Sequence, residues 1–424
     1  MSFFEELSWR GLVNQVTHEE LKDELEKGSM TLYSGFDPSA DSLHIGSLLP
    51  ILLLAHAQRA GHRPIVLVGG GTGLIGDPSF KAAERSLLTK EDVARNAEGI
   101  RAQLARFISF EGENAAIMVN NADWLCSFSL IDFLRDVGKH FSVNVMLSRE
   151  SVRQRLEDRD HGISFTEFSY GLLQGYDFLY LNEHYGCRLQ VGGSDQWGNI
   201  VSGMDLTRRM RGEDTFGLTH PLVTKADGSK FGKSESGNVW LDPARTSPYK
   251  FYQFWINQAD ADVARCLRYF TFLTQEEVLE YERQIAEEPH LRAAQRRLAE
   301  EVTRLVHGED ALANAIKASQ AMFGGGLDGL DEATLLDVFS EVPSTELPMA
   351  MLEEGRLLLD VLADAGVFAS KSKARRMVKS GGLYVNSNRV EAEDAVLDEA
   401  SCLCGGIAVV RKGKKNYHLL RFVR

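Results

Sequence analysis

The sequence has few cysteines and no long hydrophobic run, and each scarcity excludes a class of protein. Five cysteines scattered over 424 residues are too few and too irregular for a disulfide framework. The closest two, Cys402 and Cys404, lack the second pair or the histidines that a zinc site needs, so we expect no protein-held metal. The longest apolar run, residues 48–56, is far too short to span a bilayer. Because the N-terminus is acidic where a signal peptide is basic, we expect a cytoplasmic protein.

Basic residues are also in the minority, but they are unevenly distributed. The chain has 47 Lys and Arg against 60 Asp and Glu, a formal net charge of −13. Residues 356–424 hold 13 of these cations against 7 acidic residues, which leaves 34 against 53 in the remainder. A basic C-terminal module on an acidic body suggests a polyanionic partner, although a solvated basic surface would give the same count.

The first half of the chain alternates between strand and helix patterns. Residues 30–34 and 64–68 have the character of short buried strands, each followed by glycines and a helical stretch, and residues 188–191 resemble a further strand. This alternation predicts an α/β fold with a doubly wound, Rossmann-like parallel sheet. Ligands bind such sheets beyond the carboxyl ends of the strands.

Changes in composition predict four parts of the chain. Residues 1–222 form the Rossmann-like domain, and residues 223–325 form a mainly α-helical domain that starts with a glycine-rich loop. The glycines at 324–326 open a loose acidic stretch, so residues 326–353 are predicted to be a linker. Residues 354–424 then form a small α+β domain.

A glycine-rich segment follows the second predicted strand and matches a dinucleotide-binding pattern. Residues 71–76 fit G-x-G-x-x-G, which requires a helix to start at the glycines and to point its N-terminus at a pyrophosphate. Pro78 follows two residues later and disfavours helical geometry at Asp77. We therefore expect a loop that approaches a ligand closely and presents Asp77 to it.

Two short boxes carry chemistry that suits a nucleotide. In the first, His44-Ile45-Gly46-Ser47, the histidine would donate to phosphate near a helix N-terminus, although a lone histidine there is more often a cap. In the second, Lys230-Phe231-Gly232-Lys233-Ser234, two lysines on a glycine-rich loop would neutralise a triphosphate, although a solvated basic loop looks the same.

Together and in this order, the boxes resemble the HIGH and KMSKS signatures of class I aminoacyl-tRNA synthetases. Three more segments resemble the tyrosine-specific branch of that family: Tyr33-Ser34-Gly35-Phe36-Asp37-Pro38, residues 170–177 and residues 192–199. The sequence departs from the family where Ser47 replaces a frequent second histidine, so this position carries no charge. Phe231-Gly232 also replaces Met-Ser, with both lysines and Ser234 retained.

The resemblance implies a role for each matching residue. Tyr33 and Asp177 would bind the phenol of tyrosine, and Asp77, Tyr170 and Gln174 would hold its ammonium. Tyr170, Gln174 and Asp177 have a spacing that places them on one face of a helix. Catalysis would rest on His44, Lys230 and Lys233. The residues implied for ATP and the adenylate are Gly35, Asp37, His44, Gly46, Ser47, Asp195, Gln196, Lys230, Lys233 and Ser234.

The C-terminal domain contains a basic segment that is predicted to be a helix ended by a glycine pair. It resembles the S4-type RNA-binding fold, which implies a grip on tRNA through phosphate contacts. Its candidate tRNA-binding residues are Lys371, Arg375, Arg376 and Lys379.

The resemblance also implies a reaction and its partners. L-tyrosine would react with ATP, accompanied by Mg²⁺ and without a tightly bound cofactor, and the tyrosyl group would then pass to tRNA(Tyr). The family is dimeric, so a homodimer is expected, with the apolar run 133–147 as a candidate contact. Three alternatives remain open: a nucleotidyltransferase outside translation, a non-catalytic RNA-binding protein, and a tryptophan-specific enzyme.

Overall fold

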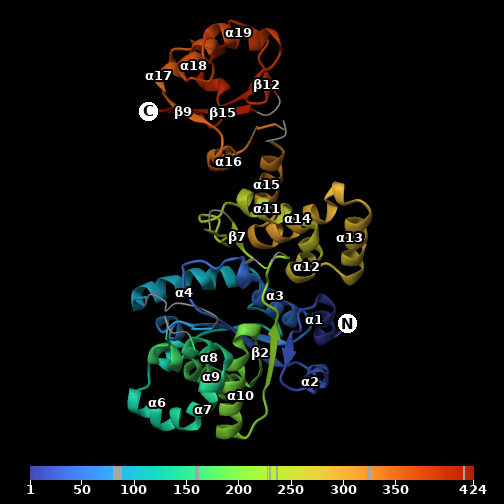
Figure 1. Cartoon of the computed structure of the whole chain (residues 1–424), viewed down its shortest axis with the longest axis vertical. Coiled ribbons are helices and arrows are strands. Elements are labelled where there is room, and N and C mark those ends of the chain that lie inside the picture. The colour runs from blue at the N-terminus through green and yellow to red at the C-terminus, as the bar shows by residue number, and fades with distance from the viewer. Residues whose placement is uncertain are drawn as a thin grey trace. The chain divides into compact units, whose positions relative to one another are not determined.

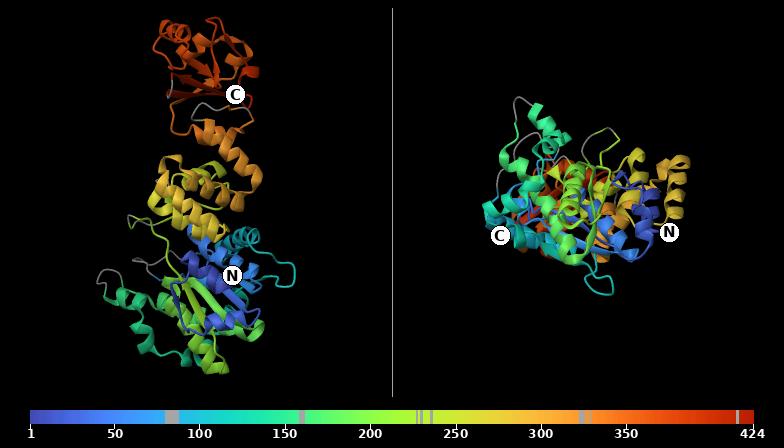
Figure 2. Two further views of the ribbon diagram at one scale, coloured as in Figure 1. Left: turned by 90° about the vertical axis from the view of Figure 1, so that its right-hand side faces the viewer. Right: turned by 90° about the horizontal axis from the view of Figure 1, so that it is seen from below.

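A computed structural model describes most of the chain, which divides into two compact units. The first comprises residues 1–245 and 258–298, and the second comprises residues 246–257 and 299–424. The described residues are 1–79, 88–157, 162–226, 228, 231–234, 237–321, 326–327, 329–413 and 416–424, without the side chains of residues 151, 154, 233 and 234. Figures 1 and 2 show the elements of each unit.

The first unit is built on a six-stranded sheet in the order β1-β6-β5-β2-β3-β4. Its strands are β1 Gln15–Val16, β2 Thr31–Phe36, β3 Arg63–Val68, β4 Ile117–Asn120, β5 Cys187–Gly193 and β6 Phe216–His220. Strands β2 to β6 pair in parallel, and only the short β1 pairs antiparallel at one edge. The predicted doubly wound sheet is confirmed, because the three strands expected from sequence correspond to β2, β3 and β5.

The direction of the connections places helices on both faces of this sheet. From β2 the chain moves through β3 to β4, and from β5 it moves to β6 on the other side of β2. Right-handed crossovers then put α3 and α4 on one face and α10 on the other, where α9 packs against α10. The helices of this unit are α1 Phe3–Arg10, α2 Leu21–Glu26, α3 Ile45–Arg59, α4 Lys90–Leu104, α5 Ala122–Leu125, α6 Leu130–Asp136, α7 Val143–Ser148, α8 Glu150–Glu157, α9 Phe165–Tyr185, α10 Trp197–Arg211, α12 Asp260–Phe270 and α13 Gln275–Glu287.

The glycine-rich segment after β3 does not form a dinucleotide-binding turn. A short 3₁₀ turn, Thr72–Leu74, follows the strand, and the next α-helix in the described part of the chain starts only at Lys90. A β-carbon on Gly69 would lie 2.1 Å from Asp37 Oδ1, and one on Gly70 would lie 2.2 Å from Asn120 Oδ1. These glycines are therefore needed because two neighbouring strand ends approach the loop closely.

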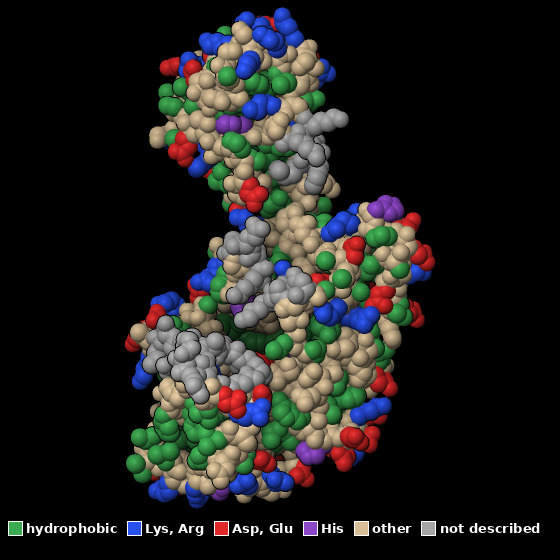
Figure 3. All heavy atoms as spheres, in the orientation of Figure 1, with side chains coloured by type: hydrophobic (Ala, Val, Ile, Leu, Met, Phe, Trp, Pro, Cys, Tyr) green, Lys and Arg blue, Asp and Glu red, His purple; other side chains and the backbone are tan. Residues whose placement is uncertain are grey.

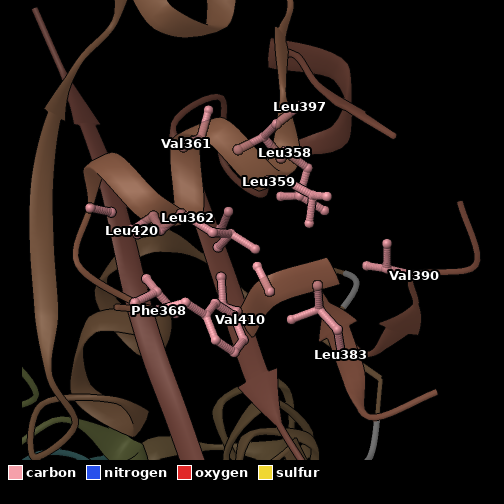
Figure 4. Close-up of a cluster of buried hydrophobic side chains, with 14 of the residues drawn as sticks. Leu358, Leu359, Val361, Leu362, Phe368, Leu383, Val390, Leu397, Val410 and Leu420 are labelled. Atoms are coloured by element: carbon pink, nitrogen blue, oxygen red, sulfur yellow. The ribbon is translucent and has the colours of Figure 1, made fainter. Parts of the chain in front are cut away.

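The second unit combines helices with a small mixed sheet. Its helices are α11 Pro248–Ile256, α15 Glu309–Ala321, α16 Glu332–Val338, α17 Ala350–Glu353, α18 Leu358–Asp364 and α19 Lys371–Lys379, and α14 Ala293–His307 runs into it from the first unit. Five strands pair in the order β12-β11-β14-β15-β9, with bounds β9 Ser344–Pro348, β11 Leu383–Val385, β12 Asn388–Arg389, β14 Ile407–Lys412 and β15 Asn416–Val423. Figure 4 shows the apolar core that the helices α18 and α19 share with this sheet, including Leu362, Phe368, Leu383 and Val410.

The stretch predicted as a linker, residues 326–353, contributes regular structure to this unit. Strand β9 pairs in parallel with β15, and Leu347 and Leu352 join the same apolar core. The sequence pattern does not show this strand, because it is rich in proline, serine and acidic residues. Its burial comes from a partner about seventy positions later, Leu419 to Val423. None of the helices in the described ranges is both long and apolar enough to span a bilayer.

Candidate functional site

A cavity of about 320 Å³ lies at the carboxyl ends of the parallel strands in the first unit. It opens where β2 and β5 are neighbours, the point at which the strand order reverses and where such sheets bind ligands. The structure brings the predicted site residues among residues 1–222 together around it. The cavity is lined by Tyr33, Gly35, Asp37, His44, Gly46, Ser47, Asp77, Tyr170, Gln174, Asp177, Asp195 and Gln196.

The strand register divides the cavity lining between the two faces of the sheet. Tyr33 is paired with Gln190, and its ring contacts Phe178 of α9, with 5.3 Å between the ring centroids. Side chains alternate along a strand, so the next residue on β5, Val191, faces the opposite side, where α3 lies, and Gly193 with its register partner His220 shares that side. The cavity therefore has a lobe toward α9 and a lobe toward α3.

Asp177 lies at the base of the α9 lobe and is fixed by two donors. Asn121 Nδ2 donates to its Oδ2 at 2.9 Å, and the indole Nε1–H of Trp124 donates to its Oδ1 at 2.8 Å. Burial raises the pKa of Asp177 to about 8, against the opposing effect of these two hydrogen bonds. The carboxyl group is therefore held in place while its charge remains easy to change near neutral pH.

Three further carboxylates, those of Asp37, Asp77 and Asp195, line the cavity. Tyr170 donates its hydroxyl to Asp37 Oδ2 at 2.8 Å, and burial raises the pKa of Tyr170, with Asp37 adding to the effect. Gln196 Nε2 donates to Asp77 Oδ2 at 2.7 Å. Burial also raises the pKa of Asp195, and the nearby charge of Asp77 adds to this shift. A cluster of carboxylates, in which Asp177 and Asp195 have raised pKa values, favours a ligand that brings positive charge or hydroxyl donors.

The first box forms the cap of α3. His44 is the N-cap residue, and its Nδ1 accepts from the backbone N–H of Gly46 at 3.0 Å. Burial lowers the pKa of His44, so the ring is neutral at pH 7 and carries its proton on Nε2. A β-carbon on Gly46 would lie 2.8 Å from this ring, which explains why the box needs a glycine here. The box thus offers one N–H donor at the positive end of a helix.

The second box is described from Phe231 to Ser234, and Lys230 lies outside the described residues. Phe231 is buried, and the backbone of Lys233 and Ser234 forms a short strand, β7 Lys233–Ser234, paired with β8 Gly237–Asn238. A β-carbon on Gly232 would lie 3.7 Å from the backbone nitrogen of Gly46. The structure therefore brings the two boxes together, although nearly two hundred residues separate them in sequence.

Several polar atoms of the cavity lining are buried and have no hydrogen-bond partner within the described chain. They are Tyr33 Oη, Gln174 Oε1, Gln190 Oε1 and His220 Nε2. An unpaired buried polar group costs about 1–3 kcal/mol, so a native structure rarely leaves several in one place unless a ligand satisfies them.

Sequence reasoning missed four polar residues that build this site. Gln190 and His220 line the cavity, and Asn121 and Trp124 orient Asp177. His220 is the last residue of β6, a position that could have found it, whereas Gln190 lies in the middle of β5 and carries no such signal. Asn121 and Trp124 lie just beyond β4, whose residues are only half buried and give a weak strand pattern.

The predicted basic helix of the second unit is present as α19. Its four candidate cations are all exposed, and Figure 3 shows Lys and Arg side chains gathered over this helix. Lys371 is paired with Asp360 at 2.8 Å, while Arg375 and Lys379 share Glu393 at 2.7 and 3.3 Å. The helix therefore presents a basic surface that neighbouring carboxylates partly neutralise.

Comparisons with known proteins agree with this geometry. Residues 25–324 match the family model of class I tRNA synthetases (W and Y), and residues 334–420 match that of the tyrosine–tRNA ligase SYY-like C-terminal domain. The chain is 57% identical to a tyrosine–tRNA ligase of Roseiflexus castenholzii and 54% identical to one of Geobacillus kaustophilus, each over 100% of both chains. A C-terminally truncated mitochondrial tyrosyl-tRNA synthetase of Aspergillus nidulans is similar in structure, with a TM-score of 0.69 and 30% identity over 76% of this chain and 94% of that one.

Proposed function

We propose how the described site carries out the reaction of this chain, which belongs to the tyrosine–tRNA ligase family of class I tRNA synthetases. The reaction has two steps. The carboxylate of L-tyrosine attacks the α-phosphate of ATP, which gives tyrosyl-adenylate and pyrophosphate. A hydroxyl of the 3′-terminal ribose of tRNA(Tyr) then attacks the carbonyl carbon of the adenylate, which forms the tyrosyl ester and releases AMP. Positioning and charge stabilisation carry most of the first step, so no dedicated nucleophile is needed.

The unpaired hydroxyl of Tyr33 carries the assignment of the tyrosine subsite. It is fully buried in the α9 lobe and has no partner among the described residues. A phenol bound there accepts from Tyr33 and donates to Asp177, which satisfies both groups at once. Phenylalanine would leave them unpaired, and an indole would offer a donor but no acceptor.

The ammonium of the substrate is held one helical turn from the phenol subsite. Gln174 lies on the same face of α9 as Asp177, and its unpaired Oε1 accepts from an N–H donor. Asp77 supplies the opposite charge, and Tyr170 contributes through its hydroxyl. An ammonium has three donors and no acceptor, so it matches three oxygen atoms and excludes amino acids with a blocked amine.

The nucleotide occupies the lobe toward α3. The nearest atom to a β-carbon on Gly35 would be 3.7 Å away, in Leu67, so protein packing alone does not require this glycine and its missing side chain leaves room for a ligand. His44 donates from Nε2 to phosphate, with the N–H of Gly46 and the hydroxyl of Ser47 nearby. Asp37, Asp195 and Gln196 line the adenylate.

The second box supplies positive charge to the phosphates. Lys230 and Lys233 neutralise the charge that develops as pyrophosphate leaves. Ser234, the last residue of the box, belongs to the same ATP-binding set. Mg²⁺ arrives with ATP as part of the substrate and shares this neutralisation. Each of these groups acts on the transition state more than on bound tyrosine.

The chain works as a homodimer in the cytoplasm and binds tRNA(Tyr) through its basic domain. The dimer contact is supported by an exposed apolar patch over α6, α7 and the start of α9, visible as a green area in Figure 3. Its most exposed members are Leu130, Ile131, Val143, Val145 and Phe165, at 72%, 69%, 58%, 53% and 76% exposure. A patch of this kind is typical of an interface between proteins. Light scattering on Phe165→Asp, compared with the unchanged chain, checks whether it holds two copies together.

One assay separates the proposed function from its alternatives. ATP–pyrophosphate exchange is measured with tyrosine, phenylalanine and tryptophan, and tRNA charging follows with any amino acid that responds. Exchange and charging with tyrosine alone support the proposal. Exchange without charging would indicate a nucleotidyltransferase, no exchange a non-catalytic RNA-binding protein, and a response to tryptophan a different specificity.

A further inference from the structure

We propose that helix α12 is a seat that positions the second box over the first, with Asp262 and Phe270 as its positioning residues. The inference rests on the proposed function, because it assigns the second box to the adenylate step. Both ends of α12 contact the segment that carries the box. The helix itself lies outside the cavity lining, so these residues touch no substrate.

The N-terminal turn of α12 holds the chain just before the second box. The Asp262 carboxylate is 4% exposed and accepts the backbone N–H of Ala226 at 3.0 and 3.2 Å. Arg265, one turn further along, donates to Asp262 at 2.6 Å and to the carbonyl of Thr224 at 2.5 Å. One ion pair, of which the Asp262 carboxylate is buried, thus binds two backbone groups, the N–H of Ala226 and the carbonyl of Thr224.

The C-terminal end of α12 holds the box itself. Phe270 is fully buried, and its ring stacks on the ring of Phe231, with 5.5 Å between centroids and 7° between the planes. A stacked aromatic pair contributes beyond the apolar area that it buries. The aromatic residue that departs from the family signature at position 231 therefore has a defined contact in this chain.

The seat is itself anchored to the body of the first unit. The guanidinium of Arg10 is 1% exposed and donates to the carbonyls of Arg268, Thr271 and Leu273 at 2.8, 2.9 and 2.7 Å. Glu6 balances its charge at 2.7 Å. Because a buried arginine binds three carbonyls at and just beyond the C-terminal end of α12, this end of the helix has little freedom to shift.

The position of the seat is transmitted to the first box through backbone hydrogen bonds. The N–H of Val239 donates to the carbonyl of Gly232 at 3.0 Å, and the N–H of Ile45 donates to the carbonyl of Val239 at 3.0 Å. Thus α12 contacts Thr224, Ala226 and Phe231, and the next residue, Gly232, is hydrogen-bonded to Val239, which is hydrogen-bonded to the start of α3. A shift of the seat moves Lys233 relative to His44 and leaves the tyrosine lobe as it is.

The test compares two aspartates in the same helical turn. Asp262→Ala removes the acceptor of Ala226. Asp260→Ala is the matched control, because Asp260 accepts from Gln295 at 2.5 Å and has no hydrogen bond to the described residues of the second box. Asp262→Asn keeps one acceptor oxygen and is the conservative rescue. Phe270→Leu removes the aromatic stack while it keeps an apolar side chain.

We expect Asp262→Ala and Phe270→Leu to slow single-turnover adenylate formation by about tenfold to a hundredfold, the usual effect of a small misplacement of catalytic groups. Tyrosine binding at equilibrium should stay within about twofold of the parent, Asp262→Asn should recover most of the rate, and Asp260→Ala should keep the parent rate. Equal losses of rate in Asp260→Ala and Asp262→Ala would contradict the positioning role of α12. A full rate of adenylate formation in Asp262→Ala would contradict it as well. An inactive parent chain would instead overturn the proposed function.

Discussion

Replacing Trp124 with phenylalanine tests how the phenol subsite is built. The change removes the indole N–H that donates to Asp177 at 2.8 Å and keeps an aromatic ring against Tyr180, whose ring stacks on Trp124 at 4.2 Å. A hydrogen bond to an ionised group contributes about 1.5–3 kcal/mol and one between neutral groups about 0.5–1.5 kcal/mol. Because the pKa of Asp177 is about 8, the loss should depend on pH.

The expected result follows from the charge of Asp177. At pH 9, where the carboxylate is ionised, the dissociation constant for tyrosine should rise by about tenfold to a hundredfold, and at pH 6 by about twofold to tenfold. Equilibrium dialysis with labelled tyrosine measures both values. Trp9→Phe is the control, since its indole N–H donates to Glu6 on α1, outside the cavity lining. Unchanged tyrosine binding at both pH values would refute the role of Trp124.

Further predictions concern the pocket, the second box and the basic helix. Tyr33→Phe should bring the kcat/KM values for tyrosine and phenylalanine at least about tenfold closer in pyrophosphate exchange, because the removed hydroxyl pairs only with tyrosine; an unchanged ratio would contradict this. The pKa of Asp177 is raised on folding to about 8, so the unfolding free energy should fall by up to about 1.4 kcal/mol per pH unit from about pH 5 to pH 8. Urea unfolding measured at several pH values should show a smaller dependence of this free energy on pH for Asp177→Asn than for the parent, and an equal dependence would contradict the shift. Lys233→Ala should slow adenylate formation and leave tyrosine binding nearly intact, so unimpaired exchange would remove its catalytic role. Replacing the four cations of α19 with alanine should reduce both the rate of tRNA charging and its dependence on salt, and should leave ATP–pyrophosphate exchange unchanged. Undiminished charging at moderate salt would show that α19 does not bind tRNA.

The sequence was sufficient to predict the parts of the site that follow from local pattern. Strand β2 carries Tyr33 and ends just before Asp37, and helical spacing places Tyr170, Gln174 and Asp177 on one face of α9. Each of these positions depends on periods of two or 3.6 residues that a sequence displays directly. Family resemblance then linked the separate segments to one cavity.

The remaining features depend on contacts that no local pattern records. Asn121 and Trp124 reach Asp177 across more than fifty positions, and Phe270 reaches Phe231 from a helix that had no predicted role. Strand β9 is polar and short, and it exists because β15 supplies its hydrogen bonds. Such elements are selected by tertiary packing, which outweighs the loop-like composition of residues 326–353.

A crystal structure of the chain with L-tyrosine tests the assignment of the two cavity lobes. We expect the phenolic oxygen within hydrogen-bond distance of Tyr33 Oη and Asp177, and the ammonium beside Gln174 and Asp77. Tyrosine bound in the lobe toward α3, or bound with its ammonium at Asp177, would contradict it.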